Sequence, residues 1–272
     1  MGWLAHGARW REPSLVQKLD YLAYAWRATL RKCTFTVSQM HLYGQYCPIA
    51  RAAEILADRW TVLIIRELLA DINQFNELER GLPHVSRSLL TERLRRLERT
   101  GILVRRVAPR GKPAAYRLTP AGYELQKIID VFGEWGARWA FGDPRPNELD
   151  PIVLLWWMRR RVCVEALGKR RVVIEFNFGR PKGTYWLLIE PADVSVCIRH
   201  PGFEVDVIVS AEILAFYRVW LGRVSLSEAL RKGQVQLNGT PADIRSFPCW
   251  FRWSPMADTV RAALADQSMA KL

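Results

Sequence analysis

Apolar residues between positions 47 and 142 recur at helical spacing, which predicts a mostly helical segment with one short pair of strands. Two helices are expected first, a strongly apolar one over 60–69 and a shorter one over 75–82, and both are interpreted as scaffold. Beyond Gly101, two strands are expected over 102–107 and 115–118, joined by a turn that contains two prolines, a glycine and two cations. The pattern therefore predicts helices followed by a hairpin with a basic tip.

Between the scaffold helices and the hairpin, a third helix is predicted over 86–99. Its residues Leu90, Leu94 and Leu97 fall at i, i+4 and i+7, so this side must face a core. The opposite side is polar and mostly basic. A helix of this kind suits the major groove of duplex DNA.

The helical pattern breaks at 142–147, where two prolines and several turn-forming residues indicate a linker. A helix is expected over 151–167, followed by short half-buried strands in which apolar and polar residues alternate. The apolar positions of that alternation are Val194, Val196, Ile198, Phe203, Val205, Val207 and Val209. The expected elements after them are helices over 211–221 and 227–232, a strand over 234–238 and a last helical stretch after Pro241.

The first 46 residues form a third region, in which Leu15, Leu19, Leu22, Trp26 and Leu30 fit one amphipathic helix. We expect residues 1–44 to be an N-terminal extension, either helical or partly disordered, and Met40 is an alternative start. The other predicted limits are a domain over 45–142, a linker over 143–150, a second domain over 151–257 and a tail over 258–272.

Composition adds a partner class to this outline. A chain of 272 residues is long enough for two cores, and its 50% hydrophobic and 25% charged residues are typical of globular proteins. The net charge of +13 favours a polyanion, either nucleic acid or an anionic membrane surface. Apolar runs such as 152–158 are far too short to span a bilayer, and the start lacks a secretory pattern. We therefore expect a cytoplasmic protein without stable membrane insertion.

Several kinds of site are not indicated by the sequence. The four histidines are isolated, and no GxSxG, HExxH or GxGxxG motif is present, so we expect neither an enzyme nor a metal or cofactor site. Five cysteines without a CxxC pair argue against a zinc site and a disulfide framework. The cysteines are Cys33, Cys47, Cys163, Cys197 and Cys249.

The basic helix and hairpin are the candidate DNA-binding surface. Between His84 and Arg117, ten Lys and Arg residues accompany two acids, an excess of eight positive charges. Helix starts favour phosphate, arginine can read guanine, and hydroxyls can bond bases or phosphates. A solvated surface helix is the alternative interpretation, but the succession of helix, turn, basic helix, glycine and basic hairpin favours DNA. The candidate residues are Ser86, Arg87, Ser88, Thr91, Arg95, Arg110 and Lys112.

Residues 47–141 resemble the HxlR-type branch of winged-helix regulators, which is related to MarR-like proteins. The resemblance rests on Cys47-Pro-Ile-Ala50, Asp58-Arg-Trp-Thr61, Arg66-Glu-Leu68, Phe75-Asn-Glu-Leu78, Ser86-Arg-Ser-Leu-Leu-Thr-Glu-Arg-Leu94 and Tyr116-Arg-Leu-Thr-Pro-Ala-Gly122. It implies a transcription regulator that binds double-stranded DNA as a homodimer, with 86–99 as recognition helix and 110–112 as wing tip. A helix over 120–140, expected to be interrupted at Gly133 and Gly136, would hold the dimer together with the segment near Cys47. Some relatives use a cysteine at that position as an oxidation sensor, and a small buried residue before Pro48 is the alternative.

Residues 151–253 resemble a sterol-carrier-protein-like lipid-binding domain, through 203–210, 220–230, 234–239 and 247–250. The fold class expected is therefore α+β: a winged helix-turn-helix domain followed by an α/β sterol-carrier-like domain with a mostly antiparallel sheet. The resemblance implies an apolar tunnel for a lipid or other apolar effector, although the same pattern fits a filled core. The candidate lining residues are Val194, Val196, Val205, Val207, Trp220 and Leu221. A lipid carrier on anionic membranes and a thiol-based redox regulator are the alternative functions.

Overall fold

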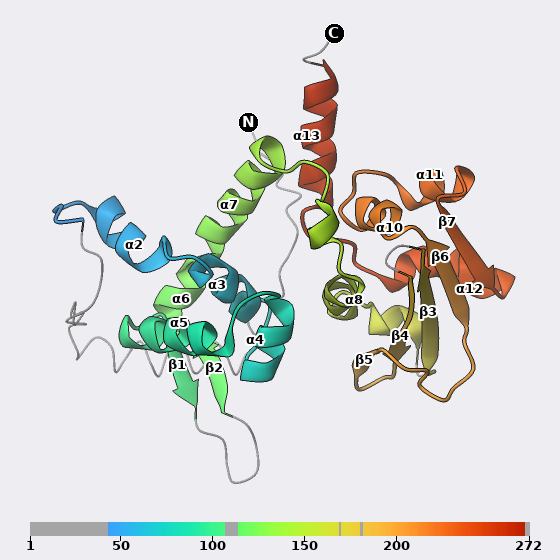
Figure 1. Ribbon diagram of the computed structural model, residues 1–272, viewed down its shortest axis with the longest axis horizontal. Coiled ribbons are helices and arrows are strands. Elements are labelled where there is room, and N and C mark those ends of the chain that lie inside the picture. Colours follow the sequence, from blue (N-terminus) through green and yellow to red (C-terminus); the bar gives the residue numbers. More distant parts are fainter. Residues whose placement is uncertain (1–42, 107–113, 169, 180–181, 270–272) are drawn as a thin grey trace. The chain divides into compact units, whose positions relative to one another are not determined.

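The computed structural model describes residues 43–106, 114–168, 170–179 and 182–269 (Figure 1). Its contacts divide the chain into unit 1, Met1–Phe132, and unit 2, Gly133–Leu272, which are treated separately below. The helix expected near Leu15 to Leu30 and the tip of the predicted hairpin, including Arg110 and Lys112, lie outside the described residues. No described helix combines the length and apolar character needed to cross a membrane. The domain limits expected from the sequence stay predictions.

Unit 1 contains the predicted succession of helices and hairpin. Its elements are α2 (Pro48–Leu56), α3 (Thr61–Leu69), α4 (Phe75–Gly81), α5 (Arg87–Arg99), β1 (Leu103–Arg106), β2 (Ala115–Leu118) and α6 (Pro120–Glu124), followed by α7 (Gln126–Trp139), which runs on into unit 2. The helices expected over 60–69, 75–82 and 86–99 and both strands are confirmed. Strands β1 and β2 are antiparallel, with Leu103 opposite Leu118.

The core of unit 1 lies behind α5. Leu90, Leu94 and Leu97 are at most 1% exposed and join a cluster with apolar residues of α3, α4 and β1. Burying one such leucine stabilises the fold by about 2 kcal/mol, so the leucine side of the helix is fixed against the core. The spacing argument for this helix is therefore confirmed.

The hairpin is joined to the helices on both sides. Gln74, just before α4, forms an isolated antiparallel bridge with Ala115, and the Tyr116 N–H donates to the Asn73 carbonyl at 2.7 Å. At the other end, the Thr119 hydroxyl donates to the carbonyls of Gly101 at 2.6 Å and Ile102 at 3.1 Å. These bonds set the direction in which the two strands leave the helical body.

Gly122 completes the corner after β2. The Gly122 N–H donates to the Thr119 hydroxyl at 3.2 Å, so Thr119 caps α6. A Cβ at position 122 would collide with the Ile102 carbonyl oxygen and lie 2.9 Å from Leu118 Cδ2. Only glycine allows α6 to approach the hairpin this closely.

The helix expected over 120–140 is divided, but at a different place from the one predicted. Leu125 separates α6 from α7, whereas Gly133 and Gly136 lie within α7 without interrupting it. The expectation of an interruption at the glycines is wrong, because a helix tolerates glycine at a cost of about 1 kcal/mol when its surroundings require it. At Gly133 a Cβ would lie 3.1 Å from the Met256 sulfur, so the glycine leaves room for that side chain.

Unit 2 is an α+β assembly with one five-stranded sheet. Its elements are the short helix η1 (Pro146–Glu148), α8 (Pro151–Arg159), α9 (Val164–Leu167), β3 (Val172–Phe178), β4 (Gly183–Ile189), β5 (Val194–Cys197), β6 (Val207–Ala211), α10 (Ile213–Trp220), α11 (Leu226–Arg231), β7 (Val235–Gly239), α12 (Pro241–Ser246), η2 (Phe247–Trp250) and α13 (Ala257–Met269). The strand order is β5-β4-β3-β6-β7. The sheet is mixed, because β3 and β6 run parallel while the other three pairs are antiparallel.

The helix expected over 151–167 is two helices. After α8, Val162 forms an antiparallel bridge with Phe251, and the Cys163 N–H donates to the Trp250 carbonyl at 2.8 Å. A backbone N–H that bonds a distant carbonyl no longer bonds the preceding helical turn. The prediction of one continuous helix is therefore wrong.

The predicted strand around 203–209 is shorter than expected. Phe203 and Val205 precede β6, and the Arg171 guanidinium lies 3.8 Å from the centre of the Phe203 ring. The Asp206 carboxylate accepts a hydrogen bond from the Val173 N–H at 2.7 Å, and the Asp206 N–H donates to the Val173 carbonyl at 2.9 Å, so bonding to β3 begins at Asp206 and not at Phe203. Ile198 likewise follows the end of β5 and is exposed.

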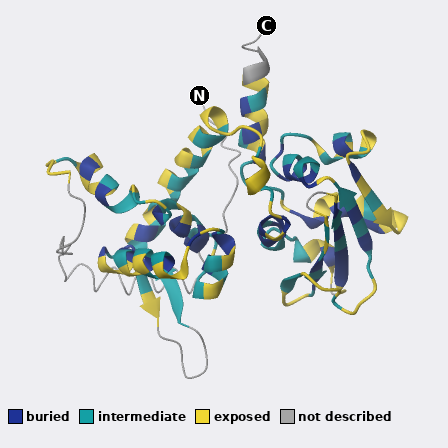
Figure 2. Cartoon of the chain, in the orientation of Figure 1, coloured by how far each residue is buried: buried dark blue, intermediate teal, exposed yellow. Residues whose placement is uncertain are grey.

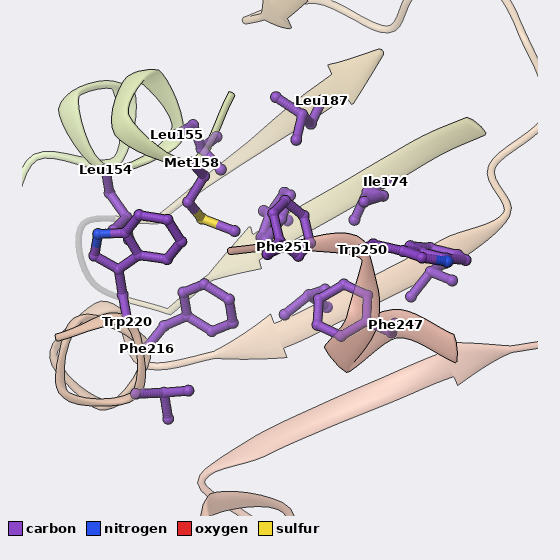
Figure 3. Packing of buried hydrophobic residues seen from close by; sticks show 14 of the residues in the cluster. Leu154, Leu155, Met158, Ile174, Leu187, Phe216, Trp220, Phe247, Trp250 and Phe251 are labelled. Carbon is purple, nitrogen blue, oxygen red and sulfur yellow. The ribbon is translucent and has the colours of Figure 1, made fainter. Parts of the chain in front are cut away.

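One face of the sheet packs against helices to form the core of unit 2 (Figure 3). Leu154, Leu155 and Met158 come from α8, Phe216 and Trp220 from α10, and Phe247, Trp250 and Phe251 from the segment at η2. They meet strand residues such as Ile174 and Leu187 (Figure 3). Aromatic side chains thus fill much of the space between the layers.

Gly122 gives a direct test of the corner after β2. We expect Gly122→Ala to lower the free energy of unfolding by about 1–3 kcal/mol, because the added methyl group meets backbone rather than a movable side chain. Equilibrium urea unfolding measures the change. Gly142→Ala is the matched control, since no atom lies within 4 Å of its added Cβ. Equal stability of the two variants would contradict the close approach.

Candidate nucleic-acid interface

The start of α5 is a polar, exposed helix terminus. The Ser86 hydroxyl accepts a hydrogen bond from the Leu89 N–H at 3.2 Å and lies 3.1 Å from the Ser88 hydroxyl. Exposed and buried residues both occur along α5 (Figure 2). Ser86 and Ser88 are exposed, and the first turn of α5 contains no acidic residue. The positive end of the helix dipole is therefore not neutralised by its own side chains, which favours an anion.

Further along α5, Arg95 and Arg99 are exposed and, within the described residues, form no ion pair or side-chain hydrogen bond. Thr91 is half-buried, and its hydroxyl donates to the Arg87 carbonyl at 2.7 Å. That hydroxyl can still accept a hydrogen bond but has used its proton. Arg95 is thus the freest of the predicted contacts on this helix.

Arg87 is exposed but has partners on α4. Its guanidinium forms an ion pair with Glu79 and lies 4.9 Å from the centre of the Phe75 ring. Its second terminal nitrogen donates to the Asn76 amide oxygen at 3.4 Å. Arg87 is therefore held in one position on the surface of unit 1.

Two other arginines of α5 point toward the body of unit 1. Arg96 forms an ion pair with Asp58 and donates to the Glu54 carbonyl, and Arg93 lies 3.6 Å from the same Asp58 carboxylate. The arginine side chains are 15% and 16% exposed. These contacts connect α5 to the α2–α3 segment, so Arg93 and Arg96 serve the fold.

Glu54 extends this polar layer. Its buried carboxylate accepts hydrogen bonds from the Tyr43 N–H at 3.0 Å and from Arg51 at 3.1 Å. Burial raises the pKa of Glu54, but these hydrogen bonds and the Arg51 charge outweigh it, and the net pKa is lowered. The carboxylate is therefore charged at neutral pH and holds the start of the described chain against α2.

The structure thus separates the described basic residues of 84–117 into those that are exposed and those that pair with other parts of unit 1. Ser86, Arg87, Ser88 and Arg95 share the exposed side of α5, Thr91 lies at its margin, and Arg110 and Lys112 are outside the described residues. Sequence reasoning did not identify Asp58 and Glu79 as partners of arginines. Asp58 lies between α2 and α3, 38 positions from Arg96, and Glu79 lies on α4, 8 positions from Arg87, so no local pattern could have indicated these pairs.

Cys47 precedes α2 as its N-cap residue. Its side chain is partly buried and makes no capping hydrogen bond. The oxidation-sensor role expected from the resemblance stays a prediction.

The six residues predicted to line an apolar tunnel occupy different environments. Val207 and Trp220 are fully buried in the core of unit 2, while Val194, Val196 and Leu221 are partly buried against it. Val205 is half-buried before β6. A pocket of about 510 Å³ in unit 2 has another lining, which mixes apolar groups with polar side chains of Asn177, Ser210, Glu212, Gln234 and Gln236.

Helix α7 carries exposed apolar side chains. Ile128, Phe132, Trp135 and Trp139 are spaced by three or four residues and are between 50% and 71% exposed. We call these four residues the α7 stripe. Tyr46 and Ile49, next to Cys47, are also largely exposed. Contiguous exposed apolar surface of this kind marks an interaction site.

Comparison with known proteins matches residues 55–143 to the HxlR-like helix-turn-helix family. The chain is 36% identical over 98 residues to the uncharacterized HTH-type transcriptional regulator YvaP of Bacillus subtilis strain 168, which covers 35% of this chain and 91% of YvaP. It is 37% identical over 126 residues to the uncharacterized HTH-type transcriptional regulator Rv3095 of Mycobacterium tuberculosis strain H37Rv, covering 46% of this chain and 73% of that protein.

Among solved structures, the chain is similar to the reduced form of the transcriptional regulator YodB from B. subtilis. The identity is 32%, the TM-score is 0.32, and the match covers 35% of this chain and 96% of that one. Since the alignment with YvaP spans nearly all of that regulator, the similarity extends over a whole protein of this type rather than a short motif. The chain therefore belongs to the HxlR-like helix-turn-helix family of transcriptional regulators.

Proposed function

We propose that the protein regulates transcription as a dimer whose α5 enters the major groove of operator DNA. The observation that carries the proposal is the exposed side of α5, which carries Ser86, Arg87, Ser88 and Arg95 and whose own first turn contains no acidic residue. In helix-turn-helix proteins the N-terminal residues of the recognition helix contact base edges. Phosphates of the same groove are within the ordinary reach of arginines further along such a helix.

The hairpin completes the proposed interface. Its strands are joined to the helical body through Gln74 and Thr119, so β1 and β2 leave it in a defined direction. Arg110 and Lys112, between the two strands in sequence, are proposed to contact the phosphates of the DNA backbone beside the groove. A second, distant contact of this kind fixes the orientation of a protein on DNA and adds to the salt dependence.

The dimer is proposed to form through the α7 stripe. Two tryptophans, a phenylalanine and an isoleucine along one side of a helix are a large apolar area to leave in water. A second copy of the same helix is a self-complementary partner, as expected for a two-fold interface. The exposed Tyr46 and Ile49 lie in the other segment assigned to this interface.

Unit 2 is proposed to be sterol-carrier-like and to hold an apolar effector. The support is the set of partly buried residues Val194, Val196 and Leu221 at the margin of the hydrophobic core of unit 2. A ligand that fits one arrangement of the protein better than another would change operator affinity by the ratio of its two affinities. Cys47 is a separate proposed site of regulation by oxidation.

Arg95 and Arg96 are adjacent residues with opposite expected roles. We expect Arg95→Ala to weaken DNA binding and to lower the slope of log affinity against log salt by about 0.9, the value for one phosphate contact. Its stability should stay within about 0.5 kcal/mol of wild type. Arg96→Ala should instead destabilise unit 1 by about 1–3 kcal/mol, because Asp58 and the Glu54 carbonyl lose their donor.

Fluorescence anisotropy over a salt series and urea unfolding measure the two effects. The two variants remove the same side chain from neighbouring positions, so each is the control for the other. Unchanged affinity and slope in Arg95→Ala would count against the proposed interface.

The dimer is tested by making the α7 stripe polar. We expect the double substitution Phe132→Ser and Trp135→Ser to convert a dimer to monomers, because buried aromatic residues dominate interface free energies at about 2 kcal/mol or more each. Analytical ultracentrifugation measures the mass. Glu134→Ser, an exposed polar position between them, is the control and should stay dimeric. A dimer that survives the double substitution would exclude this helix as its interface.

The effector role is tested with a panel of fatty-acyl and isoprenoid-like compounds. We expect at least one compound to raise the unfolding temperature of the protein and to change its affinity for duplex DNA in gel retardation. Binding to anionic vesicles is compared over the same salt range, because a lipid carrier would prefer the vesicles to the duplex. No shift in either temperature or affinity would remove the effector from the proposal.

A further inference from the structure

The ion pair between Arg87 and Glu79 lies at the centre of the proposed interface. Arg87 is the first residue of α5, and its side chain is 64% exposed, whereas that of Glu79 is 30% exposed. An exposed pair contributes little to folding stability, about 0–1 kcal/mol. The ion pair between Arg87 and Glu79 therefore adds little to the stability of unit 1, and stability does not account for it.

The ion pair also lowers the positive charge that Arg87 presents to a DNA phosphate. Salt-dependent binding grows with the number of phosphates neutralised, and Glu79 cancels the charge of Arg87 at close range. Arg95 has no anionic partner among the described residues and keeps its full charge. Two arginines on the same side of α5 thus differ electrostatically.

The contacts of Arg87 hold its side chain in one geometry. Glu79 accepts from one terminal nitrogen, Asn76 from the other, and the Phe75 ring lies 4.9 Å from the guanidinium carbon. A flexible arginine loses rotamer freedom when it binds, and ordering it beforehand removes part of that cost. The exposed part of the planar group keeps other N–H donors available.

An ordered, neutralised guanidinium at the start of a recognition helix suits a base better than a phosphate. Guanine offers O6 and N7 as a pair of acceptors in the major groove, and a planar guanidinium bonds both at once. Direction matters for such a contact, and net charge matters little. For a phosphate contact, the net charge of the arginine matters more than the direction of its hydrogen bonds.

We infer that Glu79, with Phe75, positions Arg87 to read a guanine, so that Arg87 determines sequence specificity while Arg95 supplies phosphate affinity. This inference rests on the proposed function. Glu79 is a positioning residue because it acts on DNA only through Arg87. The ligand feature assigned to Arg87 is the major-groove edge of a G·C pair.

The experiment compares three variants on two duplexes. One duplex is an operator selected from a random library with the wild-type protein, and the other is a scrambled duplex of the same composition. The variants are Glu79→Gln, the double variant Glu79→Gln with Arg87→Ala, and Arg95→Ala. The double variant removes one positive and one negative charge, so it leaves the net charge unchanged. Circular dichroism confirms that each variant is folded.

We expect the double variant to lose about 5- to 100-fold in operator affinity, with little change in the salt slope. Arg95→Ala should weaken both duplexes alike and lower the slope by about 0.9. Glu79→Gln should bind the scrambled duplex more tightly with a slope steeper by about 0.9, and the ratio of operator to scrambled affinity should fall.

Two results would overturn the inference while leaving DNA binding intact. One is an equal loss on both duplexes in the double variant, which would make Arg87 a phosphate contact. The other is an unchanged affinity ratio in Glu79→Gln, which would deny a positioning role. If the wild-type protein selects no sequence and Arg95→Ala changes nothing, the proposed function fails and the inference fails with it.

Discussion

The burial of three leucines on one side of α5 is the constraint on which the candidate interface depends. Leu90, Leu94 and Leu97 together contribute several kcal/mol to unit 1, so the helix cannot rotate about its axis without losing most of that free energy. Its rotation decides which arginines meet water. Arg87 and Arg95 are turned outward as a result, whereas Arg93 and Arg96 are turned toward the neighbouring helices.

The arginines of α5 differ in role because some of them pair with acidic residues outside this helix, namely Asp58 and Glu79. Asp58 takes up the two inward arginines and so connects α5 to the preceding helices. Glu79 engages an outward arginine, where the same kind of ion pair restrains a surface group instead of closing a core. Because an ion pair both orients and neutralises, the count of basic residues overstates the charge available to DNA. The available charge is set by which partners the fold brings near.

The sequence was informative wherever periodicity and local chemistry agree. Leucine spacing located α5, Ser86 marked its start, and Gly101 marked its end, because capping and burial act within a few residues. In unit 2 the same reasoning failed where distant segments compete for backbone bonds. Phe251 pairs with Val162 and ends a helix that local propensity would continue. Strands β3 and β4 were not singled out, although Ile174 to Phe178 alternates apolar and polar residues as half-buried strands do.

The sequence by itself determined the order of elements in unit 1, the buried side of α5 and the basic character of its other side. These features follow from interactions between residues one or two helical turns apart, so the segment itself is enough to specify them. Only the tertiary structure decided which arginines form ion pairs. Asp58 lies 38 positions from Arg96, and Glu79 lies on a different helix from Arg87. The tertiary structure likewise decided the parallel pairing of β3 with β6. Contacts across such distances depend on how whole elements pack, and no spacing rule encodes them.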